Sequence, residues 1–525
     1  MTETRPSWFA VIRRRSRWIF LAPILAFIAL AAWAFASPIG AGPDDDYHLV
    51  SVWCADGGTT ECTPATSSNA RTVAQGFTEI TCFAQVDTRS AGCQKSVWAH
   101  FSDRTVQTKR GNFVGEYPPL YYATMHAFAG TDIQTSALAM RLINAALFVG
   151  LATALAALLP VTRRRSLLWG WLVALVPLGM FLIPSNNPSG WAITGVGTAF
   201  LALLGWFETT GRRHWALGAL YLVGMLMAAG ARGDAAVYAL GATVTVIILT
   251  VVRTRGWLLS AILPLAGLAV AVAFLLTASQ AGDAATGFSN GDPSTTSLPD
   301  GASGGTLSGL ALAAYNLLML PFLWTGVWGT WGLGWLDTSL PALVPWAAAS
   351  AFVVVAFAGL GRLGWRKAIA TTGVLIVLIV LPVYVLTAGG DKVGTSLQPR
   401  YLLPLIVLFT FLLVTEPLDP AATLRAGRTL SFTRVQTFAI LGALALANLV
   451  SLQVDIRRYV TGIDHQGLNL DSGAEWWWTG FPLGPTAVWV IGALAYAGLL
   501  AVLWPQLRRQ VQSPVAASVG TAALL

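Results

Sequence analysis

The segment WIFLAPILAFIALAAWAFAS at residues 18–37 is followed almost at once by Gly42-Pro43-Asp44-Asp45-Asp46-Tyr47-His48. A membrane-crossing helix needs about 20 mostly apolar residues, which the first segment supplies. Three aspartates therefore lie at the mouth of an expected membrane helix, and we call Asp44, Asp45 and Asp46 the acidic cluster. Charged groups are costly near lipid and usually have a function there. We expect the rest of the chain to fix this cluster at one membrane face.

The composition is that of a membrane protein. The chain has 525 residues, of which 55% are hydrophobic and 11% charged, and its mean hydropathy is +0.63. Soluble domains have about a quarter of their residues charged. The first segment is not followed by a convincing small-residue cleavage site, so we interpret it as a retained helix. The fold class predicted is an all-α polytopic membrane protein.

Hydropathy places about twelve transmembrane helices in the chain. They lie near 18–37, 136–160, 167–183, 189–206, 215–230, 235–252, 257–278, 340–360, 368–388, 401–415, 434–453 and 485–504. The expected organisation is a cytoplasmic N-terminus (1–17), the first helix (18–37), an extracytoplasmic loop (38–135), helices two to seven (136–278), an external segment (279–339), helices eight to twelve (340–505) with an external loop (455–484), and a cytoplasmic tail (506–525).

The charges support this topology. It puts 20 of the 32 Lys and Arg residues on the cytoplasmic side, including Arg163-Arg164-Arg165, but only Glu3, Glu208, Glu416 and Asp419 of the 24 acids. The net charge of +8 is therefore explained by topology and does not indicate nucleic-acid binding. We expect a multi-pass protein of a bacterial plasma membrane with both termini in the cytoplasm.

All four cysteines fall in the loop that follows the first helix. This clustering of Cys54, Cys62, Cys82 and Cys93 favours an oxidising, extracytoplasmic compartment. Proximity alone suggests the pairs Cys54–Cys62 and Cys82–Cys93. A zinc site is the alternative, but the spacing lacks a CxxC motif.

The segment from 307 to 340 is apolar but broken by Pro321 and several glycines. A further crossing here would put the basic residues after 360 outside, so we interpret it as re-entrant or interfacial, behind a flexible stretch at 279–307. Trp324, Trp328, Trp331 and Trp335 recur at the spacing of an amphipathic helix. They predict an aromatic belt at the headgroups or, alternatively, a stacking surface for a sugar or lipid.

The acidic cluster allows two interpretations. One carboxylate could act as general base for an acceptor hydroxyl while its neighbour holds it or binds a divalent cation. Alternatively, the aspartates after Pro43 could cap the helix that begins near Tyr47. A cofactor is otherwise not identifiable, and the sequence names no metal.

Arg400, beside Tyr401 at the outer end of a predicted helix, is the best candidate for a phosphate ligand. The alternative is an interface anchor whose guanidinium reaches back to water. Arg141 must face protein or water, and we expect it to pair with Asp132 or a carboxylate of the acidic cluster. Further candidates for binding or supporting roles are Asp46, His48, Glu116, Tyr117, Arg232 and Asp234, where Arg232-Gly233-Asp234 could be a turn with a local ion pair or part of a cavity wall.

Three motifs resemble those of one family. Pro43-Asp44-Asp45-Asp46-Tyr47-His48 looks like the Pro-Asp-Glu-x-x-His element of membrane proteins of domain of unknown function 2142, with Asp at the Glu position. The stretches 116–122 (EYPPLYY) and 398–404 (QPRYLLP) match the same family. Those proteins resemble the GT-C glycosyltransferases, in which an early acidic residue of the first external loop is the catalytic base. The resemblance implies a GT-C-like fold with Asp44 as base and Asp45 beside it.

The resemblance implies an integral membrane glycosyltransferase. A polyprenyl-phosphate-linked sugar would be the donor, and a hydroxyl on a cell-envelope glycan or protein the acceptor, with inversion at the anomeric carbon. The 28 Arg against 4 Lys suggest a GC-rich bacterium such as an actinomycete, where the product would serve cell wall biogenesis. The alternatives are an exporter or flippase of lipid-linked glycans, or a scaffold or receptor with a disulfide-bonded external domain.

Overall fold

The computed structural model describes residues 18–279, 307–361, 363–416, 430 and 432–508. The expected cytoplasmic N-terminus (1–17), most of the expected flexible stretch (280–306) and most of the expected tail (509–525) lie outside the described residues. So do Glu3 and Asp419, two of the four acids expected on the cytoplasmic side.

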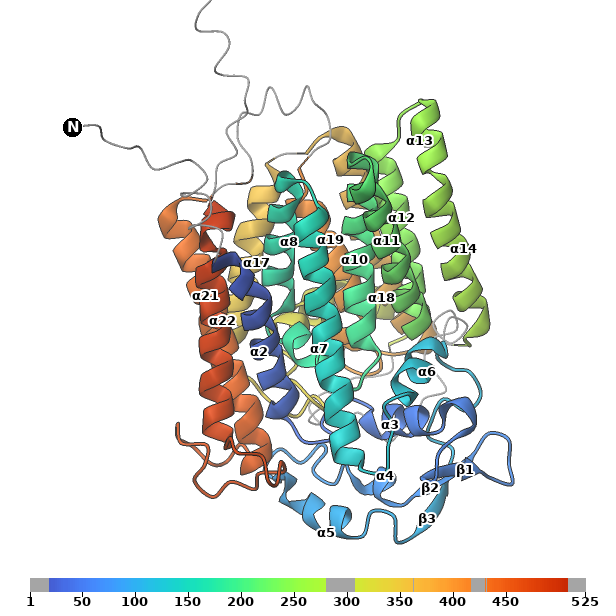
Figure 1. Ribbon diagram of the computed structural model, residues 1–525, viewed down its shortest axis with the longest axis vertical. Coiled ribbons are helices and arrows are strands. Elements are labelled where there is room, and N and C mark those ends of the chain that lie inside the picture. The colour runs from blue at the N-terminus through green and yellow to red at the C-terminus, as the bar shows by residue number, and fades with distance from the viewer. Residues whose placement is uncertain (1–17, 280–306, 362, 417–429, 431, 509–525) are drawn as a thin grey trace, which may run out of the picture.

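Long helices run side by side along the longest axis of the molecule (Figure 1). They are α2 (Leu21–Ala36), α7 (Ile133–Leu158), α8 (Val161–Leu175), α10 (Ser189–Glu208), α11 (Arg212–Ala231), α12 (Gly233–Thr250), α14 (Ile262–Thr277), α16 (Gly309–Thr325), α17 (Leu343–Leu360), α18 (Trp365–Gly389), α19 (Pro399–Val414), α21 (Arg434–Val460) and α22 (Pro485–Arg508). The chain between α2 and α7 lies at the lower end in Figure 1, which we call the loop end.

Ten helices among the described residues are long and apolar enough to cross a membrane, and α2 and α19 are shorter apolar helices. The structure therefore does not confirm the twelve transmembrane helices that the sequence predicted. The expected span 167–183 is divided into α8 and a short α9 (Leu178–Leu182), because Pro177 cannot continue the helix ladder. Conversely, Gly309–Trp328 is long and apolar enough to cross a membrane, although we interpreted this part of the sequence as re-entrant or interfacial.

Helix α10 lies at the centre of the bundle, and 94% of the residues in its apolar stretch are buried. It packs closely on α11 because each presents a glycine at the contact. A Cβ added at Gly195 would lie 2.5 Å from the nitrogen of Ala228, and one at Gly224 would lie 2.7 Å from the nitrogen of Ala199. In both helices the glycine is four residues before the alanine, the small-xxx-small spacing that lets backbones approach in membranes.

The loop end contains a small folded unit. It consists of the short helices α3 (Asp45–Trp53), α4 (Gly76–Glu79), α5 (Gln94–Ala99) and α6 (Leu120–His126) and an antiparallel sheet of β1 (Cys62–Pro64), β2 (Arg71–Ala74) and β3 (Thr105–Thr108) in the order β1-β2-β3. The expectation of an all-α chain is wrong for this loop, because it contains three strands, and the protein is mostly helical. The disulfide prediction is confirmed: Cys54 bonds Cys62, and Cys82 bonds Cys93.

The four tryptophans expected on one amphipathic helix do not share a helix. Trp324 belongs to α16 and Trp328 to the turn Gly326–Trp328, whereas Trp331 and Trp335 lie in the following loop. Positive φ angles at Gly329, Gly332 and Gly334 end the helical pattern there. Each indole instead donates to a backbone carbonyl, at Leu378, Val173, Phe322 and Gly40 respectively.

These bonds show where the chain runs after α16. Asn316 bonds Asp391, just beyond the C-terminal end of α18, and Trp324 bonds Leu378 farther up that helix. The chain then returns, because Trp335 bonds Gly40, just beyond the end of α2. Segment 309–340 thus enters the bundle from the loop end and comes back to it.

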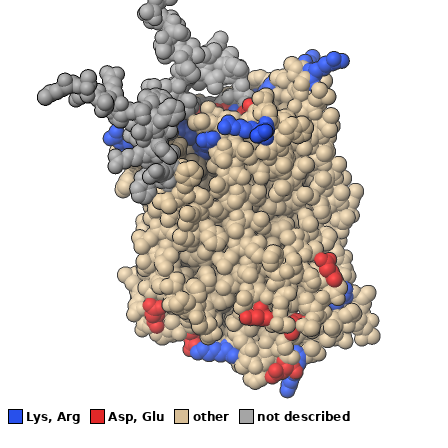
Figure 2. All heavy atoms as spheres, in the orientation of Figure 1, with Lys and Arg blue, Asp and Glu red and all other residues tan. Residues whose placement is uncertain are grey.

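The surface separates charge from apolar side chains. On the face in Figure 2, Lys and Arg lie at both ends, most Asp and Glu lie toward the loop end, and the broad band between the two ends is almost entirely uncharged. A band of this kind suits the hydrocarbon layer of a bilayer.

Candidate functional site

The turn that follows α2 is held by the second aspartate of the acidic cluster. The Asp45 carboxylate accepts hydrogen bonds from the backbone N–H groups of Gly40 (3.2 Å) and Gly42 (3.0 Å). Its side chain is fully buried, and Arg141 of α7 lies 3.6 Å away. Burial raises the pKa of Asp45, although Arg141 and the two N–H groups act in the opposite direction.

Arg141 also closes the end of α2. It donates to the carbonyls of Ala34 (3.0 Å), Ser37 (2.7 Å) and Pro38 (2.9 Å). The last carbonyls of a helix have no partner within the helix, and a cation is favourable there. The expected pairing of Arg141 with a carboxylate of the cluster is thus found with Asp45, while Asp132 instead caps α7 through Thr135.

Asp44 has different partners from Asp45. Its backbone is left-handed, with φ of 58°, and its side chain makes no capping bond to α3, so the capping interpretation is wrong for this residue. One carboxylate oxygen accepts from Arg400 and the other from Arg110 at 3.1 Å. The side chain is 31% exposed. Burial raises the pKa of Asp44, but the charges of Arg400 and Arg110 outweigh it and hold that pKa well below its usual range.

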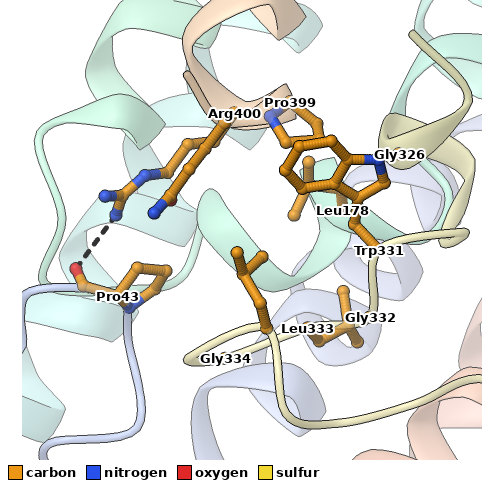
Figure 3. Close-up of a pocket in the computed structure, with 11 residues that line it drawn as sticks. Pro43, Leu178, Gly326, Trp331, Gly332, Leu333, Gly334, Pro399 and Arg400 are labelled. Atoms are coloured by element: carbon orange, nitrogen blue, oxygen red, sulfur yellow. Dashed lines mark hydrogen bonds between the residues drawn. The ribbon is translucent and has the colours of Figure 1, made fainter. Parts of the chain in front are cut away.

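Arg400 is directed into the protein. Its guanidinium, 4% exposed, donates to the carbonyl of Pro43 at 3.1 Å (Figure 3), to the hydroxyl of Tyr401 at 3.0 Å and to the carboxylate of Asp44. Pro399 stands at the first position of α19, where its missing N–H costs nothing, so Arg400 lies in the first turn of that helix. Because the guanidinium is bound inside the protein, it does not reach back to water as the interface anchor considered from the sequence would.

A second buried arginine lies beside the first. Arg232 forms two bonds of 2.9 Å with Asp234, the local ion pair expected of this turn. It also stacks 4.7 Å from the ring centre of Tyr401 and 5.5 Å from that of Tyr117. Because Arg400 lies 4.9 Å from the same Tyr401 ring, one aromatic side chain holds two guanidinium groups. The turn with a local ion pair is therefore found, whereas residues 232–234 are not among those that line the hollow described below.

The remaining predicted residues support this centre. Tyr47 donates to Glu116 at 2.7 Å, and the His48 ring nitrogen lies 2.9 Å from the Tyr122 hydroxyl. Burial lowers the pKa of His48 well below its usual value, so the ring is neutral at pH 7. Asp46 binds Arg110 at 2.9 Å.

Arg110 was not anticipated from the sequence. It bridges Asp44 and Asp46 from the loop that follows β3, and its side chain is 43% exposed. Its neighbours along the chain are polar loop residues without periodicity, so only the folded loop brings it to the acidic cluster.

The three carboxylates of the acidic cluster do not converge on one point as metal ligands would. Asp44 faces two arginines, Asp45 faces backbone N–H groups and Arg141, and Asp46 faces Arg110. Within the described ranges, groups of three or more His, Cys, Asp or Glu suited to a metal ion are not found. The acidic cluster therefore lacks the ligand set that the divalent cation considered from the sequence would need.

A small hollow lies beside Arg400. Its walls are Pro43, Leu178, Gly326, the loop residues Trp331, Gly332, Leu333, Gly334 and Leu336, and Gln398-Pro399-Arg400 (Figure 3). It has room for about one water molecule. The hollow joins the acidic turn, α19 and the loop after α16.

The bundle, its uncharged band and its buried ion pairs define a multi-pass integral membrane protein. The family of predicted membrane proteins called DUF2142 matches residues 27–409, and this chain belongs to it. Comparison with curated proteins and with solved structures gives no match.

Proposed function

We propose that this protein is a GT-C-like glycosyltransferase that moves a sugar from a polyprenyl-phosphate donor to a hydroxyl of an extracytoplasmic cell-envelope glycan or protein. The observation that carries the proposal is the contact between Asp44 and Arg400, 356 residues apart, beside a hollow near the loop end. A carboxylate that can accept a proton and a guanidinium that can bind phosphate are the two groups such a transfer needs.

The loop end is the extracytoplasmic side in this proposal. Two disulfides in the loop favour an oxidising compartment. At the opposite end the visible charged side chains are mostly basic (Figure 2), which is typical of cytoplasmic loops. A lipid-linked sugar suits this side, because nucleotide sugars are confined to the cytoplasm, and the sequence, which carries no recognisable nucleotide-binding motif, fits such a donor.

In the reaction, the acceptor oxygen forms a bond to the anomeric carbon while the bond from that carbon to the phosphate oxygen breaks. The acceptor proton passes to Asp44, and the electron pair of the broken bond stays on the lipid phosphate. Arg400 and Arg232 offset the charge that grows there. A single displacement of this kind inverts the anomeric carbon.

The structure suggests how the base is activated. Bound to Arg400 and Arg110, Asp44 is a weak base, since both charges lower its pKa. A donor phosphate would compete with Asp44 for Arg400, because arginine binds phosphate in the same bidentate way as carboxylate. Loss of that partner would raise the pKa of Asp44 toward the range in which it accepts a proton.

Asp45 has a positioning role in this scheme. Its side chain is fully buried and bound to the turn and to Arg141, so it does not reach a substrate. It fixes the backbone that carries Asp44. The hollow has to widen to admit a sugar, and the loop 329–342, which forms one wall, is the segment whose displacement would do so.

The test uses purified full-length protein, a radiolabelled polyprenyl-phosphate pentose or hexose and membrane glycan as acceptor. We expect transfer by the parent, and a loss of about 10²–10⁴-fold in Asp44→Asn, the range typical of a general base. Asp103→Asn changes an exposed carboxylate of the same loop and should leave transfer unchanged.

Full transfer by Asp44→Asn would remove the proposed base. If the protein instead moves labelled donor across vesicle membranes without forming a glycosidic bond, it is an exporter or flippase.

A further inference from the structure

Arg110 covers Asp44 on the side that faces solvent. One carboxylate oxygen of Asp44 is bound by Arg400, which is 4% exposed, and the other by Arg110, which is 43% exposed. The Asp44 side chain itself is 31% exposed. A molecule that approaches Asp44 from outside the protein therefore meets Arg110 first.

The loop that carries Arg110 is held on both sides of this residue. The backbone N–H of Arg110 donates to the side chain of Thr108 at 3.0 Å. The backbone N–H of Asn112 donates to Ser51 of α3 at 2.8 Å. The Asn112 side chain also exchanges two hydrogen bonds of 2.9 Å with the backbone of Tyr117. The fold thus fixes the place from which the Arg110 side chain reaches Asp44.

The guanidinium of Arg110 has a second edge for an anion. Its Nε and Nη2 both donate to Asp46, and Nη2 also donates to Asp44 at 3.1 Å. Its Nη1 makes no hydrogen bond within the described part of the chain. Since arginine binds two-oxygen anions along an edge of its planar fork, Asp46 can keep one edge while an external carboxylate or phosphate takes the Nη1/Nη2 edge from Asp44.

An unmatched positive charge lies next to Arg110 in the chain. Lys109 is exposed, and among the residues that the structure describes its side chain has neither a hydrogen bond nor an ion pair. The two carboxylates that Arg110 contacts are each offset by one arginine, so they leave the charge of Lys109 in excess. A local excess of positive charge favours the approach of an anionic ligand over that of a neutral one.

We propose that the acceptor is an acidic glycan, and that Arg110 binds a carboxylate or phosphate which the glycan carries close to the hydroxyl that receives the sugar. This inference rests on the proposed function, because it assigns the substrate class of the same site. The acceptor hydroxyl has to reach Asp44 from the side that Arg110 covers. A hydroxyl and an anion within one monomer are the chemistry of a uronic acid or of a phosphorylated sugar or polyol.

The two substrates then release the base together. The donor phosphate competes with Asp44 for Arg400, and the acceptor anion competes with Asp44 for Arg110. With only one substrate bound, one guanidinium still holds the carboxylate and keeps it a weak base. Asp44 is therefore free to take a proton only when donor and acceptor are both present, which protects the donor from attack by water.

The test measures binding and needs neither donor nor transfer. Purified full-length protein in a neutral detergent is titrated calorimetrically with hexagalacturonate, with a glycerol phosphate hexamer and with neutral maltohexaose. We expect at least one acidic oligomer to bind about tenfold or more tightly than maltohexaose, and to bind less tightly as salt is added. Equal affinities for acidic and neutral oligomers, or no binding of either acidic oligomer, would overturn the proposal.

Variants test the competition between the ligand and Asp44. Arg110→Gln should weaken binding of the acidic oligomer about tenfold, the effect of losing hydrogen bonds to a charged group. Its Tm should match that of the parent, because exposed ion pairs add little stability. Asp44→Asn should instead tighten binding about threefold, since the ligand no longer has to displace that carboxylate. The tightening should vanish in the double variant, and a tightening that persists without Arg110 would overturn the proposal.

Arg104→Gln is the matched control, at an exposed arginine just before β3, and should bind both acidic oligomers as the parent does. Arg110 follows the other end of the same strand.

Further outcomes separate this inference from the proposed function. Transfer to a neutral glycan at a rate that Arg110→Gln leaves unchanged would keep the proposed function and overturn the inference. If acidic oligomers bind through Arg110 but no glycosidic bond forms with any donor, the binding of an acidic glycan stands and the proposed function fails. Binding of dihexanoyl phosphatidylglycerol through Arg110, with no binding of either acidic oligomer, would assign the loop to a lipid headgroup and overturn the inference.

Discussion

Arg400 donates a hydrogen bond to Asp44 although the two residues are 356 positions apart in the chain. The same guanidinium binds the carbonyl of Pro43, the residue before Asp44. Arg400 therefore fixes both the backbone and the carboxylate of the acidic turn from the first turn of α19. A ligand that takes Arg400 away changes the position and the proton affinity of Asp44 together.

The first prediction concerns the shape of the Arg400 side chain. Arg400→Lys keeps the charge but cannot serve Pro43, Asp44 and Tyr401 at once, because an ammonium lacks the planar fork. We expect a loss of about 10–100-fold in kcat/KM for transfer, equivalent to roughly 1.4–2.8 kcal/mol. Steady-state kinetics at several donor concentrations measure it.

Arg457→Lys is its control. Arg457 binds the carbonyls of Gly467 and Asn469 in the loop after α21, away from the acidic turn. Equal losses of kcat/KM in the two variants would show that any arginine-to-lysine change at the loop end is harmful, and Arg400 would lose its special role.

The second prediction concerns the pair of Asp45 and Arg141. Arg141→Met leaves a buried carboxylate without its cation and three carbonyls without a donor, so the free energy of unfolding should fall by about 3–5 kcal/mol. Adding Asp45→Asn removes the unpaired charge and should recover part of that loss. Denaturation of the two single variants and the double variant in detergent gives the coupling energy.

Strictly additive effects would contradict the pairing, because residues in direct contact with opposite charge must couple. Asp46→Asn is the comparison, since its carboxylate binds the exposed Arg110 and is worth little to stability.

The sequence was sufficient for features that depend on local composition. The apolar runs predicted most of the helices, and the cysteine spacing predicted both disulfides, because eight and eleven residues close short loops. The motifs singled out Asp44 and Arg400, and the polar turn at 232–234 singled out Arg232. The structure pairs Asp44 with Arg400 and places both arginines against Tyr401.

Features that depend on tertiary contacts were missed. Arg110 lies in a loop without a pattern, and its role follows only from the folding of the sheet. Trp331 and Trp335 keep the spacing of a helix, but the glycines between them turn the chain toward the hollow.

The third prediction concerns the disulfide between Cys82 and Cys93. It closes the loop that supplies the carbonyls of Phe83 and Arg89 to Arg458. Cys82→Ser with Cys93→Ser should lower the free energy of unfolding by about 2–3 kcal/mol, the value for a short closed loop. Thermal unfolding with and without reductant measures it.

The double variant should be insensitive to reductant at this loop, whereas the parent should lose stability when reduced. If reduction leaves the Tm of the parent unchanged, the bond does not contribute to the folded state.

The last prediction concerns stability against pH and depends on His48. Burial lowers the pKa of His48 well below 6.5, so the folded protein keeps the ring neutral while the unfolded chain protonates it. Below pH 6.5 the unfolded state therefore binds more protons, and stability must fall as pH falls, by at most about 1.4 kcal/mol per pH unit for one group. Above pH 6.5 this contribution is constant. Asp44 does not interfere, because its lowered pKa places its own loss of stability below pH 4.

His48→Asn retains a partner for Tyr122 but does not titrate, so its unfolding free energy between pH 7 and 5 should be flatter than that of the parent. His465→Asn, at a ring that is 63% exposed, should follow the parent curve. A parent curve no steeper than that of His48→Asn over this window would show that His48 is protonated in the folded protein, because the buried carboxyl groups titrate alike in both proteins.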